Sequence, residues 1–166
     1  MPLAANRRRG GGFTMIEVLM ILAIVSVLLG IALPTYEEYR NRVDISIAKK
    51  DMVQIALKLE KYQALHYRYP EYLDDIDVDL KDPWGNEYQY LNLDDVDPNS
   101  GKIKTGDKGP KPQARKKRNL KPLNTDFDLF SRGVDGEYRP NVSARQSLDD
   151  IIRADDGDYI DYAADY

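Results

Sequence analysis

Residues 13–33 read FTMIEVLMILAIVSVLLGIAL, a run that contains a single charged side chain, Glu17. As an α-helix this run is about 31 Å long, enough to cross the hydrocarbon core of a membrane. Arg7, Arg8 and Arg9 precede it, and basic residues that flank a membrane span stay on the cytoplasmic side. The sequence therefore predicts one membrane-spanning helix with a cytoplasmic N-terminus and with the rest of the chain on the opposite side.

A cleaved secretory signal peptide and a plain signal anchor also combine a basic start with an apolar run. A secretory cleavage site would follow the run, at small residues in A-x-A spacing. The residues that follow Leu33 are Pro34-Thr35-Tyr36-Glu37, which match that site poorly. A signal anchor fits the composition equally well, so the residues before the run have to distinguish the alternatives.

The junction before the run is Gly10-Gly11-Gly12, followed by Phe13-Thr14-Met15-Ile16-Glu17. It resembles the signal of prepilins, the precursors of type IV pilins and of the pseudopilins of type II secretion. In that family a dedicated peptidase cuts after glycine, and the new N-terminal residue, usually phenylalanine, becomes N-methylated. The resemblance implies cleavage between Gly12 and Phe13, which makes Glu17 the fifth residue of the mature chain. Pro34 lies where many members carry a helix-bending proline.

Glu17 places a carboxylate inside a membrane helix, which costs free energy and points to a function. The resemblance implies that Glu17 pairs, in an assembled filament, with the free amine of Phe13 in a neighbouring subunit. Such a pair would set the axial register of assembly. The alternative is a carboxylate that only reaches the lipid headgroups, because Glu17 lies near the start of the helix.

Helical periodicity continues over residues 35–66. Apolar side chains recur at spacings of three and four along one stripe, which predicts packing against a sheet; they are Ala48, Met52, Ile55, Leu59 and Tyr62. Tyr69-Pro70 ends the helix. His66 lies beside this end, and we expect it to cap the helix rather than to bind a metal.

Two stretches of the head resemble the strand signatures of type II secretion major pseudopilins. Asp82-Pro83-Trp84-Gly85-Asn86 has the composition of a turn, and the following residues, 87–91, alternate as a strand does. We expect Trp84 to be a core anchor. Residues 126–130 alternate in the same way, with Phe127 and Leu129 on one face, and Val134-Asp135-Gly136 ends that strand as a turn.

The predicted organisation has four parts: a leader at residues 1–12, a membrane and assembly helix at 13–34, the periplasmic half of the same helix at 35–66, and a small head at 67–166. The predicted fold class is α+β. One long N-terminal helix packs on a small antiparallel sheet of about three strands, which is the lollipop architecture of pilins.

Residues 97–124 interrupt the head with nine Lys and Arg residues, and three prolines lie between Pro110 and Pro122. Large apolar residues are almost absent, so the composition predicts an exposed, flexible loop. The cluster Arg115-Lys116-Lys117-Arg118 is basic enough to attract nucleic acid or anionic lipid. No aromatic residue is interleaved for base stacking, and we therefore expect a solvated loop and no nucleic-acid partner.

The last eighteen residues hold seven Asp, and the chain has no cysteine. In major pseudopilins a calcium ion holds the loop that a disulfide closes in many type IV pilins. Calcium prefers six to eight oxygen ligands, and the resemblance implies a set made of the carboxylates of Asp135, Asp149 and Asp150 with the carbonyls of Arg132 and Ile152. The acidic stretch 155–158 is an alternative source of ligands, and an acidic tail without a metal is a further alternative.

The resemblance implies a structural subunit of a periplasmic pseudopilus that drives protein export across the outer membrane, anchored in the inner membrane with its head in the periplasm. The implied partners are copies of itself, prepilin peptidase, minor pseudopilins, the inner-membrane platform and a cytoplasmic secretion ATPase. A type IV pilin for adhesion, motility or DNA uptake is the alternative. A calcium-dependent binding module on a simple anchor is another. With one histidine and no cysteine, no nucleophile–base pair is discernible, so we do not expect an enzyme.

Overall fold

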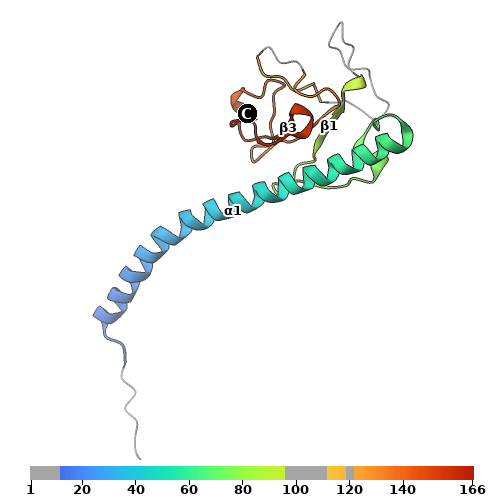
Figure 1. Ribbon diagram of the computed structural model, residues 1–166. Coiled ribbons are helices and arrows are strands. Elements are labelled where there is room, and N and C mark those ends of the chain that lie inside the picture. The colour runs from blue at the N-terminus through green and yellow to red at the C-terminus, as the bar shows by residue number, and fades with distance from the viewer. Residues whose placement is uncertain (1–11, 96–111, 119–121) are drawn as a thin grey trace, which may run out of the picture. The chain divides into compact units, whose positions relative to one another are not determined.

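The computed structural model describes residues 12–95, 112–118 and 122–166 (Figure 1). It contains one long helix, α1 (Met15–His66), and four strands, β1 (Gln89–Asn92), β2 (Phe127–Ser131), β3 (Ile151–Ala154) and β4 (Tyr159–Tyr162). Short 3-10 turns lie between them: η1 (Leu73–Ile76), η2 (Leu93–Asp95), η3 (Arg145–Ser147) and η4 (Asp155–Gly157). The chain divides into two compact units, Met1–Asn41 and Arg42–Tyr166.

The first unit contains the N-terminal part of α1, and none of its described residues is buried. By length and composition, α1 can cross a membrane, and the helix continues through Pro34. Ser26 is a polar residue within the apolar run, and its hydroxyl donates to the carbonyl of Leu22 at 2.7 Å. The helix therefore satisfies this polar group internally, as a segment surrounded by lipid requires.

In the second unit, the C-terminal half of α1 covers one face of the sheet (Figure 1). The predicted stripe is confirmed, because its first four members are 0% exposed: Ala48, Met52, Ile55 and Leu59. They pack on residues that point from one face of the sheet, among them Phe127, Leu129 and Ile151. Burial of a Met, Ile or Leu side chain contributes about 1.5–3 kcal/mol, so this contact is a main source of stability for the unit.

The end of α1 also agrees with the sequence. The helix ends at His66, whose Nδ1 lies 3.0 Å from the carbonyl oxygen of Tyr62. The two rings stack with their centroids 4.1 Å apart. The imidazole therefore occupies the C-terminal end of the helix, where the orphan carbonyls and the negative dipole end favour it, and the predicted capping role is confirmed.

The sheet is antiparallel with strand order β1-β2-β3-β4. Four strands replace the predicted three, because the stretch interpreted as an acidic tail contributes β4. Ile152 of β3 lies opposite Phe130 of β2 and opposite Asp161 of β4. The strands β3 and β4 are four residues long and join through η4. Such short segments lack a clear alternation of their own, so pairing with the sheet decides their structure.

The second face of the sheet is also buried, and all five residues of β2 are inaccessible to solvent. Its core consists of Leu123, Phe130, Val142, Ile152, Ala154 and Ala163. The prediction of an exposed loop is therefore wrong at Arg115, Leu123 and Asn124, which are buried. The rest of that loop, 97–111 and 119–121, lies outside the described residues. Composition misled here because a charged side chain can be buried once it is paired and hydrogen-bonded.

Leu59→Ala should destabilise the second unit by about 2–5 kcal/mol, because the truncation leaves a cavity under the sheet. Leu57→Ala is the matched control, since Leu57 is 59% exposed on the same helix; its effect should stay within about 0.5 kcal/mol. Trp84 is the single tryptophan, so its fluorescence during denaturant unfolding reports on this unit. Equal losses for the two variants would contradict the docking of α1 described above.

Candidate functional site

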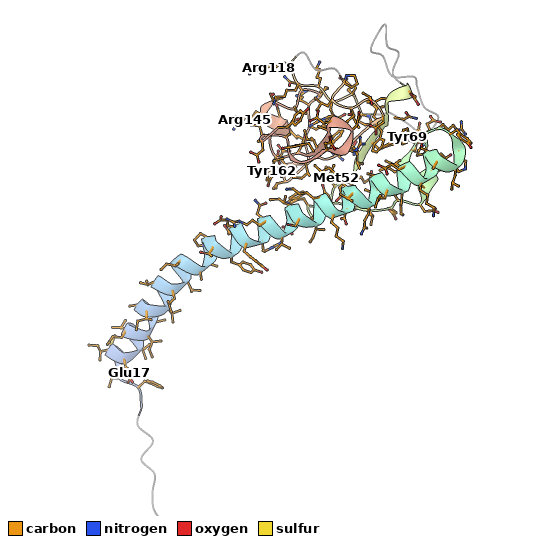
Figure 2. The ribbon with its side chains drawn as sticks, viewed as in Figure 1. Glu17, Met52, Tyr69, Arg118, Arg145 and Tyr162 are labelled. Carbon is orange, nitrogen blue, oxygen red and sulfur yellow. The ribbon has the colours of Figure 1, made fainter. Side chains whose placement is uncertain are left out.

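The predicted processing junction lies at the start of α1, where Figure 2 shows Glu17 at the N-terminal end of the helix. Thr14 and Glu17 form a reciprocal pair. The amide of Glu17 donates to Thr14 Oγ1 at 3.3 Å, and the amide of Thr14 donates to Glu17 Oε2 at 3.4 Å. This is a capping box, in which a Thr and a Glu three residues later satisfy amides at the start of a helix. Phe13 precedes the box and is 75% exposed.

The role of Thr14 was missed in the sequence, although the spacing Thr-x-x-Glu before an apolar run is the signal for such a cap. The cap brings the Glu17 carboxylate back toward the amide that adjoins Phe13. At Gly12, no heavy atom lies within 4 Å of the point where a Cβ would be. The bond between Gly12 and Phe13 therefore adjoins open space at an exposed helix start, which is compatible with cleavage.

The Asp82–Asn86 turn is joined to the end of β2 by side-chain hydrogen bonds. Asp82 Oδ1 accepts from the amides of Trp84 and Asn86 at 3.1 and 2.7 Å, and its Oδ2 accepts the hydroxyl of Ser131 at 2.5 Å. Asn86 Nδ2 donates to the carbonyl of Gly133 at 3.0 Å. Trp84 is partly buried against the core that α1 covers. The predicted turn is confirmed, and it also fixes the turn that follows β2.

Two of the predicted calcium ligands meet at that turn. Asp149 Oδ2 accepts the amides of Val134 and Asp135 at 2.9 and 3.1 Å. Asp135 Oδ1 accepts the amide of Glu137 at 2.7 Å. Gly133 has a φ of +61°, and a Cβ there would lie 2.3 Å from the carbonyl oxygen of Asp149. The close approach requires glycine, and it lets Asp149 hold the turn through backbone amides.

The other predicted ligands adjoin this turn or follow Asp149 along the chain. Asp150 is fully buried and pairs with Arg115. Arg132 directly follows β2, and Ile152 lies within β3. Among residues 12–95, 112–118 and 122–166 there is no group of three or more His, Cys, Asp or Glu side chains that could hold a metal ion. Calcium requires several converging oxygens, and the carboxylates of the predicted set do not form such a group by themselves.

The alternative acidic stretch also binds groups of the protein itself. Asp156 accepts the amide and the hydroxyl of Thr125 at 2.6 and 2.8 Å. These hydrogen bonds lower the pKa of Asp156, and the bond from the backbone amide of Thr125 has the largest effect. Asp155 Oδ1 accepts the hydroxyl of Tyr166 at 2.8 Å. These carboxylates fasten the C-terminal segment, and calcium binding by this chain stays a prediction.

Two buried charges lie on β2 and β3. Arg153 forms a two-pronged pair with Asp126, with both nitrogen–oxygen distances at 2.7 Å, and its guanidinium carbon lies 3.9 Å from the centre of the Phe127 ring. Asp128 is fully buried and accepts the amide of Arg115 at 2.6 Å and the side-chain amide of Asn124 at 2.8 Å. Burial raises the pKa of Asp128 to about 6, although these hydrogen bonds oppose the shift.

Comparisons with known proteins support the predicted prepilin signal around Gly12 and Phe13. The prokaryotic N-terminal methylation motif matches residues 7–33. The chain is 26% identical over 154 residues to the type II secretion system core protein G of Pseudomonas aeruginosa, covering 80% of this chain and 89% of that protein. It is 25% identical over 154 residues to the protein of the same name from Aeromonas hydrophila, covering 80% and 88%.

A type IV major pilin of Neisseria gonorrhoeae, PilE1, is 35% identical over 60 residues, which is 36% of each chain. No solved structure shows a significant match. The predicted prepilin signal is confirmed by these similarities.

The contribution of Asp128 to stability should fall as the pH rises from about 4 to about 6. Between the ordinary pKa of 3.8 and the folded pKa of about 6, the folded state holds a proton that the unfolded state has lost, so this stability is complete below the lower value and lost above the higher one. The loss should be on the order of 3 kcal/mol, at about 1.4 kcal/mol per pKa unit.

The measurement is the difference in unfolding free energy between the parent and Asp128→Asn, followed by Trp84 fluorescence from pH 4 to pH 7.5. The variant cannot titrate at this position. The unfolding free energy of the parent should therefore fall relative to that of the variant as the pH rises. A difference that stays constant over this range would show that Asp128 has an ordinary pKa in the folded protein.

Proposed function

We propose that this chain, which matches the prokaryotic N-terminal methylation motif and is similar to core protein G of type II secretion systems, is a structural subunit of a periplasmic pseudopilus that drives protein export across the outer membrane. One observation carries the proposal. A glycine–phenylalanine junction with a glutamate five residues from the cut begins an apolar helix that has no protein core around it.

The exposed apolar surface of this helix has to be covered by lipid or by other protein. The large apolar side chains between Phe13 and Leu33 are 44–82% exposed. A continuous apolar surface of this length is not stable in water and indicates a membrane or a protein interface. Lipid would cover it before assembly, and the helices of other subunits would cover it inside a filament.

Glu17 gives this helix a means of setting its register. Cleavage before Phe13 creates an amine one residue from the capping box that holds the Glu17 carboxylate. In the filament, we propose, the carboxylate pairs with the Phe13 amine of a neighbouring subunit. An unpaired charge costs about 2.5–3.5 kcal/mol at the centre of a membrane helix on insertion scales, and less near its end. The pair therefore favours the one axial position in which both charges are matched.

The remaining parts of the proposal concern location and partners. Arg7, Arg8 and Arg9 favour an N-terminus on the cytoplasmic side of the inner membrane, and the second unit then lies in the periplasm. Prepilin peptidase would process the leader. Minor pseudopilins, the inner-membrane platform and a separate secretion ATPase would assemble the filament. The role is structural, and we assign no catalytic residue.

A type IV pilin is the second candidate, favoured by the higher identity to PilE1. That similarity spans only about a third of this chain, whereas the similarity to core protein G spans 80%. The longer match includes at least part of the second unit, and we therefore place type II secretion first. Neighbouring genes for a secretion ATPase and an outer-membrane secretin would support this order.

The mature chain should begin at Phe13. Co-expression with a prepilin peptidase, followed by N-terminal sequencing and intact-mass measurement of the membrane-extracted protein, tests this directly. The expected product lacks residues 1–12 and carries a methylated amine. A chain that starts at Met1, or one that starts beyond Leu33, would exclude the prepilin assignment.

Glu17→Val should leave membrane insertion intact but reduce filament assembly by at least tenfold, because the charge that pairs with the Phe13 amine is lost. Ser26→Ala is the matched control, since Ser26 is another polar residue of the same span and its hydroxyl bonds only within its own helix. Membrane fractionation measures insertion, and sheared-filament yield measures assembly. Normal filament yield from Glu17→Val would remove the register role assigned to this carboxylate.

A further inference from the structure

A buried ion pair joins the basic segment to the loop in which a calcium ion was expected. Arg115 Nη2 lies 2.5 Å from Asp150 Oδ2, with side chains 1% and 0% exposed. Arg115 Nη1 donates to the carbonyl of Arg139 at 2.9 Å. One guanidinium thus holds residues from both ends of the stretch that separates Asp135 from Asp150.

The position of Arg115 is fixed from several sides. Its backbone amide donates to Asp128 on β2, and its carbonyl accepts the amide of Leu123 at 3.1 Å. Its guanidinium carbon lies 4.3 Å from the centre of the Phe130 ring, within the range of a cation–π contact. The charge is therefore held by the sheet and by its own segment, unlike a chance contact at the surface.

Two buried polar atoms of this ion pair have no hydrogen-bond partner. They are Arg115 Nε and Asp150 Oδ1. A side-on, two-pronged arginine–carboxylate pair uses Nε and Nη2 together with both carboxylate oxygens. Here the pair joins Nη2 and Oδ2 alone, so Oδ1 of Asp150 accepts from no donor among the described residues.

A divalent cation would also meet an unfavourable charge distribution at this site. It would have to share Asp150 with a guanidinium, and like charges repel strongly in a buried environment. Meanwhile Asp149 holds the amides of Val134 and Asp135. One oxygen of each carboxylate that a calcium ion would need thus accepts from a donor of the chain itself.

We propose that Arg115 supplies the positive charge that closes the 135–150 loop in this chain, so that its second unit stays folded without calcium. Arg115 is a positioning residue: it holds Asp150 and the carbonyl of Arg139 together at the second face of the sheet. The inference concerns Arg42–Tyr166 alone. It does not depend on the filament function, because neither cleavage nor assembly enters the test.

The first experiment uses the full chain, purified in detergent, with unfolding followed by Trp84 fluorescence. The melting temperature should be the same, within about 1 °C, in 5 mM calcium chloride and in excess EGTA. Binding of calcium to the folded state alone would raise it, by mass action, by many degrees at a hundredfold excess over the dissociation constant. A rise of several degrees with calcium would overturn the proposal, and this measurement requires no variant to fold.

The second experiment removes the charge. Arg115→Gln leaves Asp150 buried without a partner, and the melting temperature should fall by about 10 °C or more. Arg118→Gln is the matched control, because Arg118 lies in the same segment and is exposed; its melting temperature should change by less than about 2 °C. The double variant Arg115→Gln, Asp150→Asn should lose no more than Arg115→Gln alone, since it removes both charges.

Equal melting temperatures for Arg115→Gln and Arg118→Gln would show that the pair does not hold the loop. Asp150→Asn is measured alongside, and a double variant whose loss equals the sum of the losses of Arg115→Gln and Asp150→Asn would show that Arg115 and Asp150 act independently. Either result overturns the proposal, even where the calcium comparison agrees with it.

Discussion

The docking of α1 onto the sheet is the interaction on which the rest of the second unit depends. The strands are only four or five residues long, and a sheet of such strands has little stability unless one face is packed. Ala48, Met52, Ile55 and Leu59 provide that packing, and all are fully buried. A single helix therefore serves two environments: its first part has no protein core of its own, and its last part completes one.

Among the residues that the structure describes, no α-helix covers the second face of the sheet, and irregular segments do so with a mixture of apolar and charged groups. The chain has no cysteine, so these segments are held by non-covalent contacts. The buried arginines are central to this: Arg153 joins β3 to Asp126, and Arg115 joins the basic segment to Asp150. A buried charge is tolerated only with a partner in good geometry, and such pairs therefore also specify where each segment lies.

Local features of the sequence predicted much of this protein. An uninterrupted apolar run that follows arginines and glycines can be identified without knowing what it packs against, and so can the junction at Gly12 and Phe13. The stripe from Ala48 to Leu59 repeats with the period of a helix, and the turn at Asp82–Asn86 uses residues that favour turns. Each signal depends on neighbours within a few positions along the chain, and the structure agrees with the helix, the stripe and the turn.

The sequence by itself thus determined the long helix, its apolar N-terminal part, its docking face and the first two strands. The tertiary structure alone decided what became of the charged residues. Composition predicted a solvated loop around Arg115, and the family resemblance implied that Asp150 is a metal ligand, because neither source shows the partner of a charge. The two residues are 35 positions apart, and only the folding of β2 and β3 brings them within 2.5 Å of each other. Whether a charge is buried depends on such distant partners, because desolvation is tolerated only where an opposite charge is already in place.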